Sequence, residues 1–293
     1  MKLAQVFLLV AVTHNYFQQG NLVSSFLSKS NHRIRDVAGQ RNHLSTEGKN
    51  QHQLKSEKDD ERNPRNRYEG QKTTRTSSNN SQRRKDNATQ KIRNSGTLKE
   101  LFDLLRDADI NQIPTYWHQA SKFMYNRLEC RRIQNNPGIL KPLVEMTLKC
   151  SNRLKSPRSL AVMAHAIAKI TALTKNPIFD SEKIWEVLEC NIVEAGTNAG
   201  NGFNSIECSN ILWACAKTNR KPDKVLKVME AQVLSHIDEF NSLDTANTLW
   251  AFAKVGHSSP KLFDAFLCET TKKLGTFKPQ EISNTVWAYA TIG

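Results

Sequence analysis

The feature of this sequence that most constrains its fold is a motif that recurs every 37 residues. Trp213, Trp250 and Trp287 are separated by this spacing, and the residues around them align without gaps. A weaker copy, with His165 at the tryptophan position, lies 48 residues before the first full copy. A fixed period of this length is typical of proteins built from stacked repeats. The three full copies occupy residues 205–217, 242–254 and 279–291.

Each copy has the pattern of an amphipathic helix with its own start signal. Asn204 is followed three residues later by Glu207, which approximates a capping box, and Gly256 is expected to end the second copy. Between the copies, apolar residues at helical spacing predict second helices over 180–195, 222–240 and 260–275. Helix pairs repeated in tandem must stack on one another to bury their apolar faces. We therefore predict an all-α fold, an α-solenoid of helix pairs.

The remaining chain divides into segments of different composition. The formal net charge of +14 comes mostly from residues 31–97, which hold 16 basic and 8 acidic side chains and a single aromatic. Such a segment cannot bury enough apolar surface to offset the entropy of ordering, so a disordered basic region is predicted over 26–97. Residues 98–155 are predicted to form degenerate repeats or a helical cap, and 156–293 the helical-repeat domain.

The first 25 residues have the pattern of a signal peptide. Their apolar run, residues 3–12, is too short to span a bilayer. A serine- and arginine-rich stretch follows Phe26, and this order resembles the bipartite plastid presequence of diatoms and related algae. It implies a plastid location, with the mitochondrion as runner-up, and no stable membrane anchor after presequence removal. The basic region left behind would be a solvated linker or would bind phosphates without sequence preference.

Enzyme and metal signatures are not apparent in the sequence. Its six cysteines form no CxxC pair, so we expect reduced thiols, no metal site and no cofactor. There is no glycine-rich phosphate loop, no HExxH motif and no nucleophile elbow. We therefore expect a protein without catalysis of its own.

Residues 247–256 read Asn-Thr-Leu-Trp-Ala-Phe-Ala-Lys-Val-Gly and resemble the octotricopeptide repeat, as do 210–217 and 284–293. That family, with the related FAST kinase-like and RAP-domain proteins, shows Asn-Thr-Leu-Trp-Ala-Leu-Ala-Lys-Leu-Gly after a Pro-Gln-Glu lead-in, which recurs here at 279–281. The match is strong over 203–293 and weak over 156–200. It implies an organellar protein that binds single-stranded RNA in transcript stability, processing or translation, with other RNA-processing proteins as partners.

Two alternatives stay open beside this resemblance. One is a protein–protein interaction scaffold of armadillo-like architecture. The other follows from the RAP domain, a nuclease-like module that often ends members of the family. The sequence stops at Gly293, in the middle of a helix pair. The chain would then be the front part of a RAP-type RNA-processing nuclease.

Comparing the copies separates structural positions from binding positions. Residues that recur in the tryptophan stripe are predicted to be core, since every unit packs alike. The alternative for the tryptophans is stacking on RNA bases. Residues that vary between copies are free to carry specificity and are predicted to contact RNA. The predicted core residues are Trp213, Trp250, Trp287, Ala216, Ala253 and Ala290, and the variable candidates are Thr245, Thr248, Phe252, Thr285 and Tyr289.

Polar residues of the motif add a second set of candidates. Asn210, Asn247 and Asn284 would either contact a base or phosphate or hydrogen-bond the backbone of a neighbouring unit. Lysines are expected at the phosphates, since neutralising them provides most of the non-specific affinity for nucleic acid. The lysine candidates are Lys217, Lys254, Lys272 and Lys273.

Overall fold

The computed structural model describes residues 86–174, 178, 180–198 and 202–292. No strand occurs in these residues, which confirms the all-α class. The signal-like segment and most of the predicted disordered region lie outside the described residues. The α-helices are α4 (Leu98–Asp103), α5 (Ile113–Lys122), α6 (Arg127–Asn135), α7 (Lys141–Lys149), α8 (Pro157–Thr174), α9 (Ser181–Thr197), α10 (Ser205–Lys217), α11 (Asp223–Ser235), α12 (Ser242–Val255), α13 (Pro260–Lys273) and α14 (Pro279–Ile292).

Short 3-10 helices join several of these elements. Two of them continue second helices of the repeat, so the stretches predicted over 222–240 and 260–275 each consist of an α-helix and a final 3-10 turn. The 3-10 helices are η2 (Leu105–Asp107), η3 (Ile110–Gln112), η4 (Phe123–Tyr125), η5 (Pro137–Leu140), η6 (Ser151–Arg153), η7 (Ile237–Glu239) and η8 (Leu274–Thr276).

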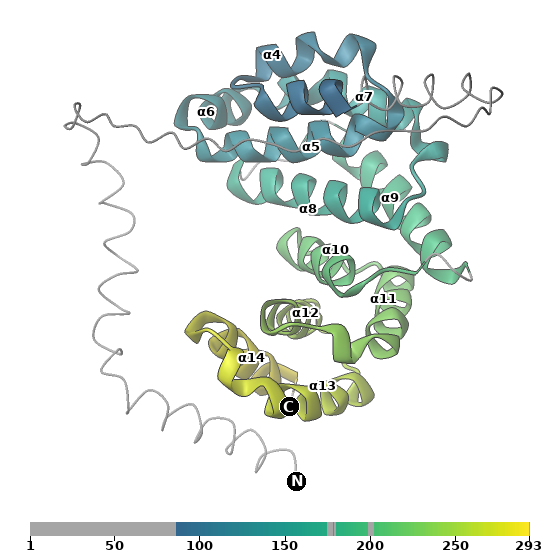
Figure 1. The fold of residues 1–293 in the computed structure, drawn as a ribbon, viewed down its shortest axis with the longest axis vertical. Coiled ribbons are helices and arrows are strands. Elements are labelled where there is room, and N and C mark those ends of the chain that lie inside the picture. The colour runs from purple at the N-terminus through teal and green to yellow at the C-terminus, as the bar shows by residue number, and fades with distance from the viewer. Residues whose placement is uncertain (1–85, 175–177, 179, 199–201, 293) are drawn as a thin grey trace, which may run out of the picture. The chain divides into compact units, whose positions relative to one another are not determined.

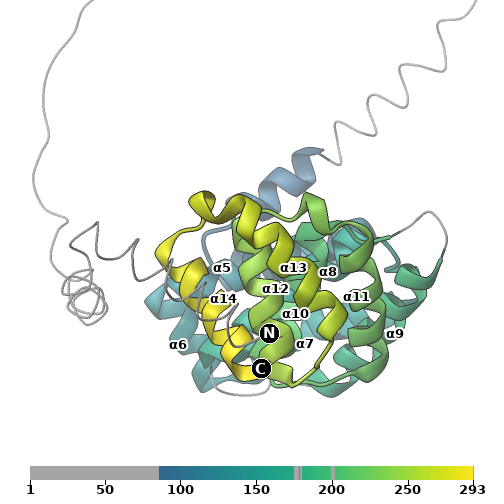
Figure 2. The ribbon, with the colours of Figure 1, turned by 90° about the horizontal axis from the view of Figure 1, so that it is seen from below.

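The helices of the 37-residue motif lie in two rows (Figure 1). In the first row α8 contacts α10, α10 contacts α12, and α12 contacts α14. In the second row α9 contacts α11 and α11 contacts α13. Figure 2 views the rows from the end formed by α13 and α14. Each sequence copy therefore contributes one helix to the first row, and each connecting segment contributes one helix to the second.

The first-row helices begin and end where local signals place them. At α10 the Asn204 side chain accepts from the Glu207 amide at 2.9 Å, and the Glu207 carboxylate accepts from the Asn204 amide at 3.1 Å. The Asn241 side chain caps α12 in the same way, accepting from the amide of Asp244. The helix α12 ends at Gly256, whose φ of 72° lies in the left-handed region that favours glycine.

Small residues let neighbouring first-row helices approach closely. Ser209 and Ala216 of α10 are buried, and so are Ala246 and Ala253, the residues at the same positions of α12. In α14 the matching Ser283 and Ala290 are exposed, because no further helix lies on that side of α14 in the described residues. Of the alanines assigned to the core, Ala216 and Ala253 are thus buried and Ala290 is exposed.

The loops after α10 and α12 make polar contacts with the preceding second-row helices, α9 and α11 respectively. Arg220 lies in the first of these loops, and its guanidinium contacts Glu182 at 2.7 Å and Glu189 at 2.9 Å, both on α9. His257 lies 37 residues later, and its Nε2 is 2.8 Å from a carboxylate oxygen of Glu230 on α11. The same position of the repeat therefore carries an inter-unit polar contact in both copies.

The folded region begins earlier than the predicted boundary at residue 98. Residues 86–94 are helical, and Ile92 is buried in the core, so the last twelve residues of the predicted disordered region belong to the folded part. The N-terminal helices also extend the two rows, because α5 contacts α8 and α7 contacts α9. Trp117 of α5 is buried and its indole N–H donates to Thr147 of α7 at 2.9 Å. Whether residues 98–155 are a cap or degenerate repeats stays a prediction.

Candidate nucleic-acid interface

Each first-row helix keeps one side free of its neighbours. The exposed and partly buried positions of α10 are 206, 207, 210, 213 and 217. Positions 210, 213 and 217 share one helix face, and the matching positions of α12 and α14 are also exposed or partly buried. We call this surface the tryptophan–lysine face. Its members are His165 and Lys169 of α8, Asn210, Trp213 and Lys217 of α10, Asn247, Trp250 and Lys254 of α12, and Asn284 and Trp287 of α14.

The tryptophans of the repeat lie at the edge of the core and not inside it, where the sequence prediction had placed them. Trp213 and Trp250 are partly buried against the core, and the side chain of Trp287 is 41% exposed. The interior that they were expected to fill is occupied by the residues that point from each helix toward the second row. Repetition at every copy therefore marks a surface feature here as well as a packing feature.

A lysine ammonium lies between two of these rings. The Nζ of Lys217 is 5.5 Å from the ring centroid of Trp213 and 5.4 Å from that of Trp250, which is cation–π geometry with both rings. On α8 the ring of His165 packs on Trp213, with the centroids 4.6 Å apart. The face therefore continues from the tryptophans onto the earlier, weaker copy of the motif.

The face carries positive charge and no carboxylate. The acids of the first helical turns are used elsewhere: Glu207 caps α10, and the carboxylate of Glu281 accepts from the amide of Lys278 at 2.8 Å. Asp244 is buried. Burial lowers the pKa of His165, and the positive charge of Lys169 and the neighbouring His118 lower it further. At neutral pH the charge of the face therefore comes from its lysines.

The asparagines of the motif lie on the same face, three residues before each tryptophan. The amides of Asn210 and Asn247 make no hydrogen bond with the described residues, while Asn284 accepts from Gln280 at 3.0 Å. The expected bond to the backbone of a neighbouring unit is therefore not formed. Two partly buried amides remain with both their donors and their acceptor available to a ligand.

The variable positions predicted to contact RNA are buried, so that assignment is wrong. Phe252 and Thr248 are 0% exposed and the phenol of Tyr289 donates to the carbonyl of Phe263 at 2.8 Å, inside the core. Thr245 and Thr285 are likewise buried. These side chains vary because they fill differently shaped spaces between the rows, and a base could reach them only if the helices separated.

Of the lysine candidates, only Lys217 and Lys254 lie on the tryptophan–lysine face. Lys272 and Lys273 belong to α13 in the second row. Lys272 pairs with Glu269 at 2.6 Å, and Lys273 donates to the backbone carbonyls of Asp238 and Phe240. Their ammonium groups stabilise contacts within the fold, which leaves the first-row lysines as the phosphate candidates.

Comparing the copies of the motif within the chain did not identify the aromatic and basic residues that extend this face onto η4 and α5. Lys169 places its ammonium 4.1 Å from the ring centroid of Tyr125, which is 77% exposed at the end of η4. Beyond the effect of burial, His118 of α5 lies near enough to His165 of α8 to lower its pKa, and Lys122 and Lys169 lower the pKa of His118. The residues around Tyr125 do not repeat the motif, so only a basic and aromatic composition could have signalled them.

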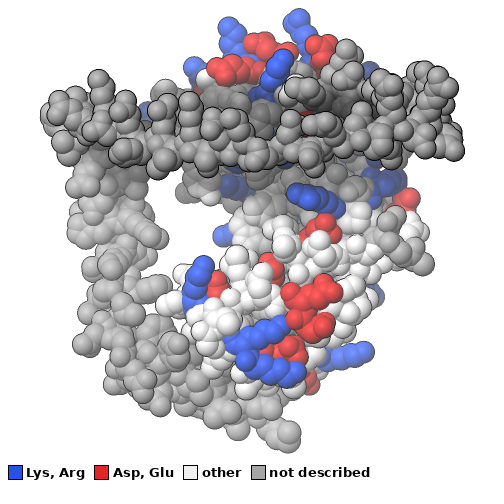
Figure 3. All heavy atoms as spheres, in the orientation of Figure 1, with Lys and Arg blue, Asp and Glu red and all other residues white. Residues whose placement is uncertain are grey.

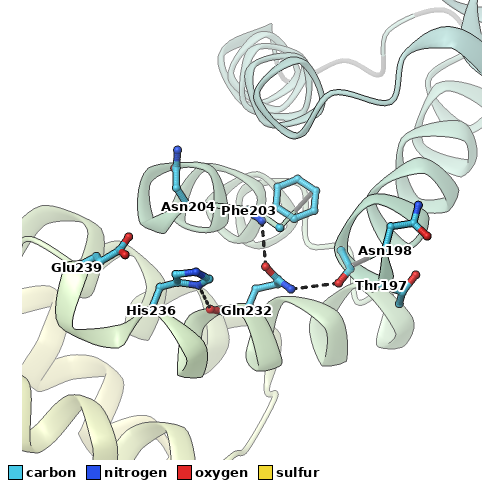
Figure 4. Close-up of a pocket in the computed structure, with 9 residues that line it drawn as sticks. Thr197, Asn198, Phe203, Asn204, Gln232, His236 and Glu239 are labelled. Carbon is cyan, nitrogen blue, oxygen red and sulfur yellow. Dashed lines mark hydrogen bonds between the residues drawn. The ribbon is translucent and has the colours of Figure 1, made fainter. Parts of the chain in front are cut away.

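An open pocket of about 610 Å³ lies elsewhere, beside α9, α10 and α11 (Figure 4). Its central side chain, Gln232, accepts from the amide of Phe203 at 3.0 Å and donates to the carbonyl of Gly196 at 3.1 Å. The ring of His236 lies 3.1 Å from the carbonyl of Gln232. Because the Gln232 amide joins two helix pairs, its role is structural, and we do not place the functional site here.

The remaining described surface gives no stronger signal. Basic and acidic side chains are interspersed on the side shown in Figure 3, so that side carries no large patch of one sign. No group of three His, Cys, Asp or Glu side chains within the described ranges is arranged to hold a metal ion. Across the same ranges, none of the helices has the length and apolarity needed to cross a membrane. The six cysteines are all free thiols, and only Cys208 and Cys215 are fully buried.

A comparison with models of protein families finds no match to this chain, and a search of curated proteins finds no similar sequence. The resemblance to octotricopeptide repeats therefore rests on the motif residues alone.

Proposed function

We propose that this chain is an α-solenoid that binds single-stranded RNA on its tryptophan–lysine face. The two rows of helices, joined by the same contacts from copy to copy, support the solenoid. The observation that carries RNA binding is the ammonium of Lys217 between the rings of Trp213 and Trp250. Regular alternation of aromatic rings and cations is how proteins bind single strands, by stacking bases and neutralising phosphates.

Single-stranded RNA suits this face better than a duplex does. Unpaired bases can turn their flat surfaces toward partly exposed tryptophans, whereas the bases of an A-form duplex stay stacked inside it. Trp213, Trp250 and Trp287 come from successive helices and can each take one base, as in other helical-repeat RNA binders. In line with the octotricopeptide resemblance, we place this activity in organellar transcript stability, processing or translation, without catalysis by this chain.

A tryptophan substitution tests the proposal directly. Replacing Trp250 with alanine in the full chain should weaken binding of a 12-nucleotide single-stranded RNA by roughly 5- to 150-fold, since stacking on an aromatic ring contributes about 1–3 kcal/mol per base. Fluorescence anisotropy at physiological salt measures the loss. Leu267→Ala is the control, because Leu267 is also partly buried and apolar but lies on α13 in the second row.

The results separate the candidate functions. Equal losses for both variants would contradict a binding role for Trp250 and indicate a general loss of stability. If the unmodified chain binds no RNA at physiological salt, the proposal fails. The partly exposed tryptophans would then fit a protein-binding scaffold, the alternative that the same architecture allows.

A further inference from the structure

The surface that faces a ligand is chemically the same in two successive copies, α10 and α12, while in α14 Thr291 replaces the lysine and Asn284 accepts from Gln280. The side chains that differ between α10, α12 and α14 at the variable positions are buried between the rows. On the tryptophan–lysine face each of these helices presents an asparagine followed three residues later by a tryptophan. A surface of identical units cannot distinguish the order of different bases along a strand. It can select only a run of one base, or no base in particular.

Other exposed side chains beside the asparagines of α10 and α12 do not supply a varied readout. Ile206 and Leu243, in the first turns of these helices, are 56% and 51% exposed, and neither has a hydrogen-bonding group. The matching residue of α14 is Gln280, whose amide donates to Asn284. The amides of Asn210 and Asn247 are the polar groups nearest to the tryptophans in sequence on this face. Since residues three apart on a helix are neighbours, each amide can reach the edge of a base stacked on its tryptophan.

The chemistry of the amide favours adenine. A carboxamide presents one donor and one acceptor side by side, and its bidentate partner among the bases is adenine, through N6 and N7. Guanine is instead recognised by the two donors of arginine or a lysine ammonium. Resting on the RNA-binding function proposed above, we propose that α10 and α12 each bind one adenine, so that the preferred ligand is an adenine run.

The lysine between the rings explains how one base per helix pair is accommodated. Packed helices lie about 8–10 Å apart, whereas stacked bases along one strand of a duplex are separated by roughly 3.4 Å. Bases bound to neighbouring tryptophans are therefore not stacked on each other. In the free protein the ammonium of Lys217 occupies the space between Trp213 and Trp250. On binding, the lysine side chain moves out to a phosphate and the base takes its place on the ring.

The test compares four 12-nucleotide RNAs with the full chain in 150 mM salt by fluorescence anisotropy: oligo(A), oligo(U), oligo(C) and a mixed sequence. We expect oligo(A) to bind about tenfold or more tightly than oligo(U), since a bidentate base contact discriminates by about 1–3 kcal/mol, or roughly 5- to 150-fold. Asn247→Leu should reduce this ratio by about fivefold or more, because oligo(A) loses more affinity than oligo(U) does. Asn152→Leu, on the exposed turn η6, is the matched control and should leave the ratio unchanged.

The outcomes distinguish a failure of the adenine preference from a failure of the proposed RNA binding. Equal binding of all four RNAs would overturn the adenine preference and leave RNA binding intact. A loss of affinity for every RNA in Asn247→Leu, with the ratio preserved, would also overturn it, because the amide would then act on the fold. No binding of any RNA would overturn both the adenine preference and the proposed function.

Discussion

At the scale of single residues, tryptophan has two distinct roles in this chain. Trp117 is fully buried and donates a hydrogen bond to Thr147, as a core tryptophan should. Trp250, on a helix of the same row, shares its exposed side with a lysine. Trp250 also packs against the core, so its ring is only partly exposed. Position relative to the neighbouring helices, and not residue type, decides the role.

His165 makes the fold sensitive to mild acid. Its pKa is lowered in the folded state by burial and by the charge of Lys169, so below about pH 6.5 the unfolded chain takes up a proton that the folded chain does not. The stability contributed by neutral His165 is therefore complete above pH 6.5 and is lost as the pH falls. We expect the Tm, followed by circular dichroism, to decrease between pH 7.5 and 5.5.

The variant His165→Phe checks this assignment, because phenylalanine keeps an aromatic ring against Trp213 but cannot be protonated. Its Tm should decrease less steeply over the same range. A residual slope is expected from His118, whose pKa is also lowered by burial and by nearby lysines. Identical slopes in the two proteins would show that protonation of His165 does not destabilise the fold.

At the scale of elements, the second row depends on a close approach between α9 and α11. A Cβ at Gly196 would overlap a methyl group of Val228 and lie 3.4 Å from the ring of Phe203. At Gly275, in η8, an added Cβ would meet nothing within 4 Å. Both substitutions to alanine remove similar freedom from the unfolded chain, so their difference reports the contact in the folded state.

We therefore predict that Gly196→Ala is less stable than Gly275→Ala by about 1–3 kcal/mol, the usual cost of inserting a methyl group into a packed interior. The free energy of unfolding in urea measures this difference. If the two variants unfold at the same denaturant concentration and with the same slope, α9 and α11 are free to move apart without cost, and the second row is not tightly packed.

At the scale of the whole molecule, two sets of basic side chains can contribute to RNA affinity: those of residues 31–97 and those of the tryptophan–lysine face. Salt dependence separates them. Each phosphate contact on a single strand contributes about −0.7 to the slope of log affinity against log salt concentration. Replacing Lys217 and Lys254 together by alanine should therefore make the slope shallower by about 1.4.

The double variant Lys224→Ala/Lys227→Ala provides the control for this measurement. These two lysines are exposed on α11 in the second row, and their loss changes the net charge by the same amount. The slope of log affinity against log salt concentration for this double variant should match that of the unmodified chain. Equal changes in the two double variants would mean that RNA responds to overall charge, and the tryptophan–lysine face would not be the binding surface.

Signals within a single helix were sufficient to predict the elements of this protein. The 37-residue spacing, the capping pair Asn204 and Glu207 and the stop at Gly256 placed the first-row helices within a residue or two of their observed ends. The start and stop signals act over one turn of backbone, so they can be recognised without knowing what packs against the helix. The start of the folded region was misplaced because the buried Ile92 is an isolated large apolar residue within a basic segment and gives no helical pattern there.

The assignment of faces required the tertiary structure. A helix inside the first row is covered on three sides, by the helices before and after it in its row and by the second row. Hydrophobic periodicity alone therefore does not tell which apolar or aromatic stripe of the helix remains exposed. Threonine and phenylalanine at 248 and 252 are core residues, while tryptophan at 250 reaches the surface. The sequence by itself determined the helices and their period, because those depend on neighbours along the chain. Only packing between helices decided which residues a ligand can touch.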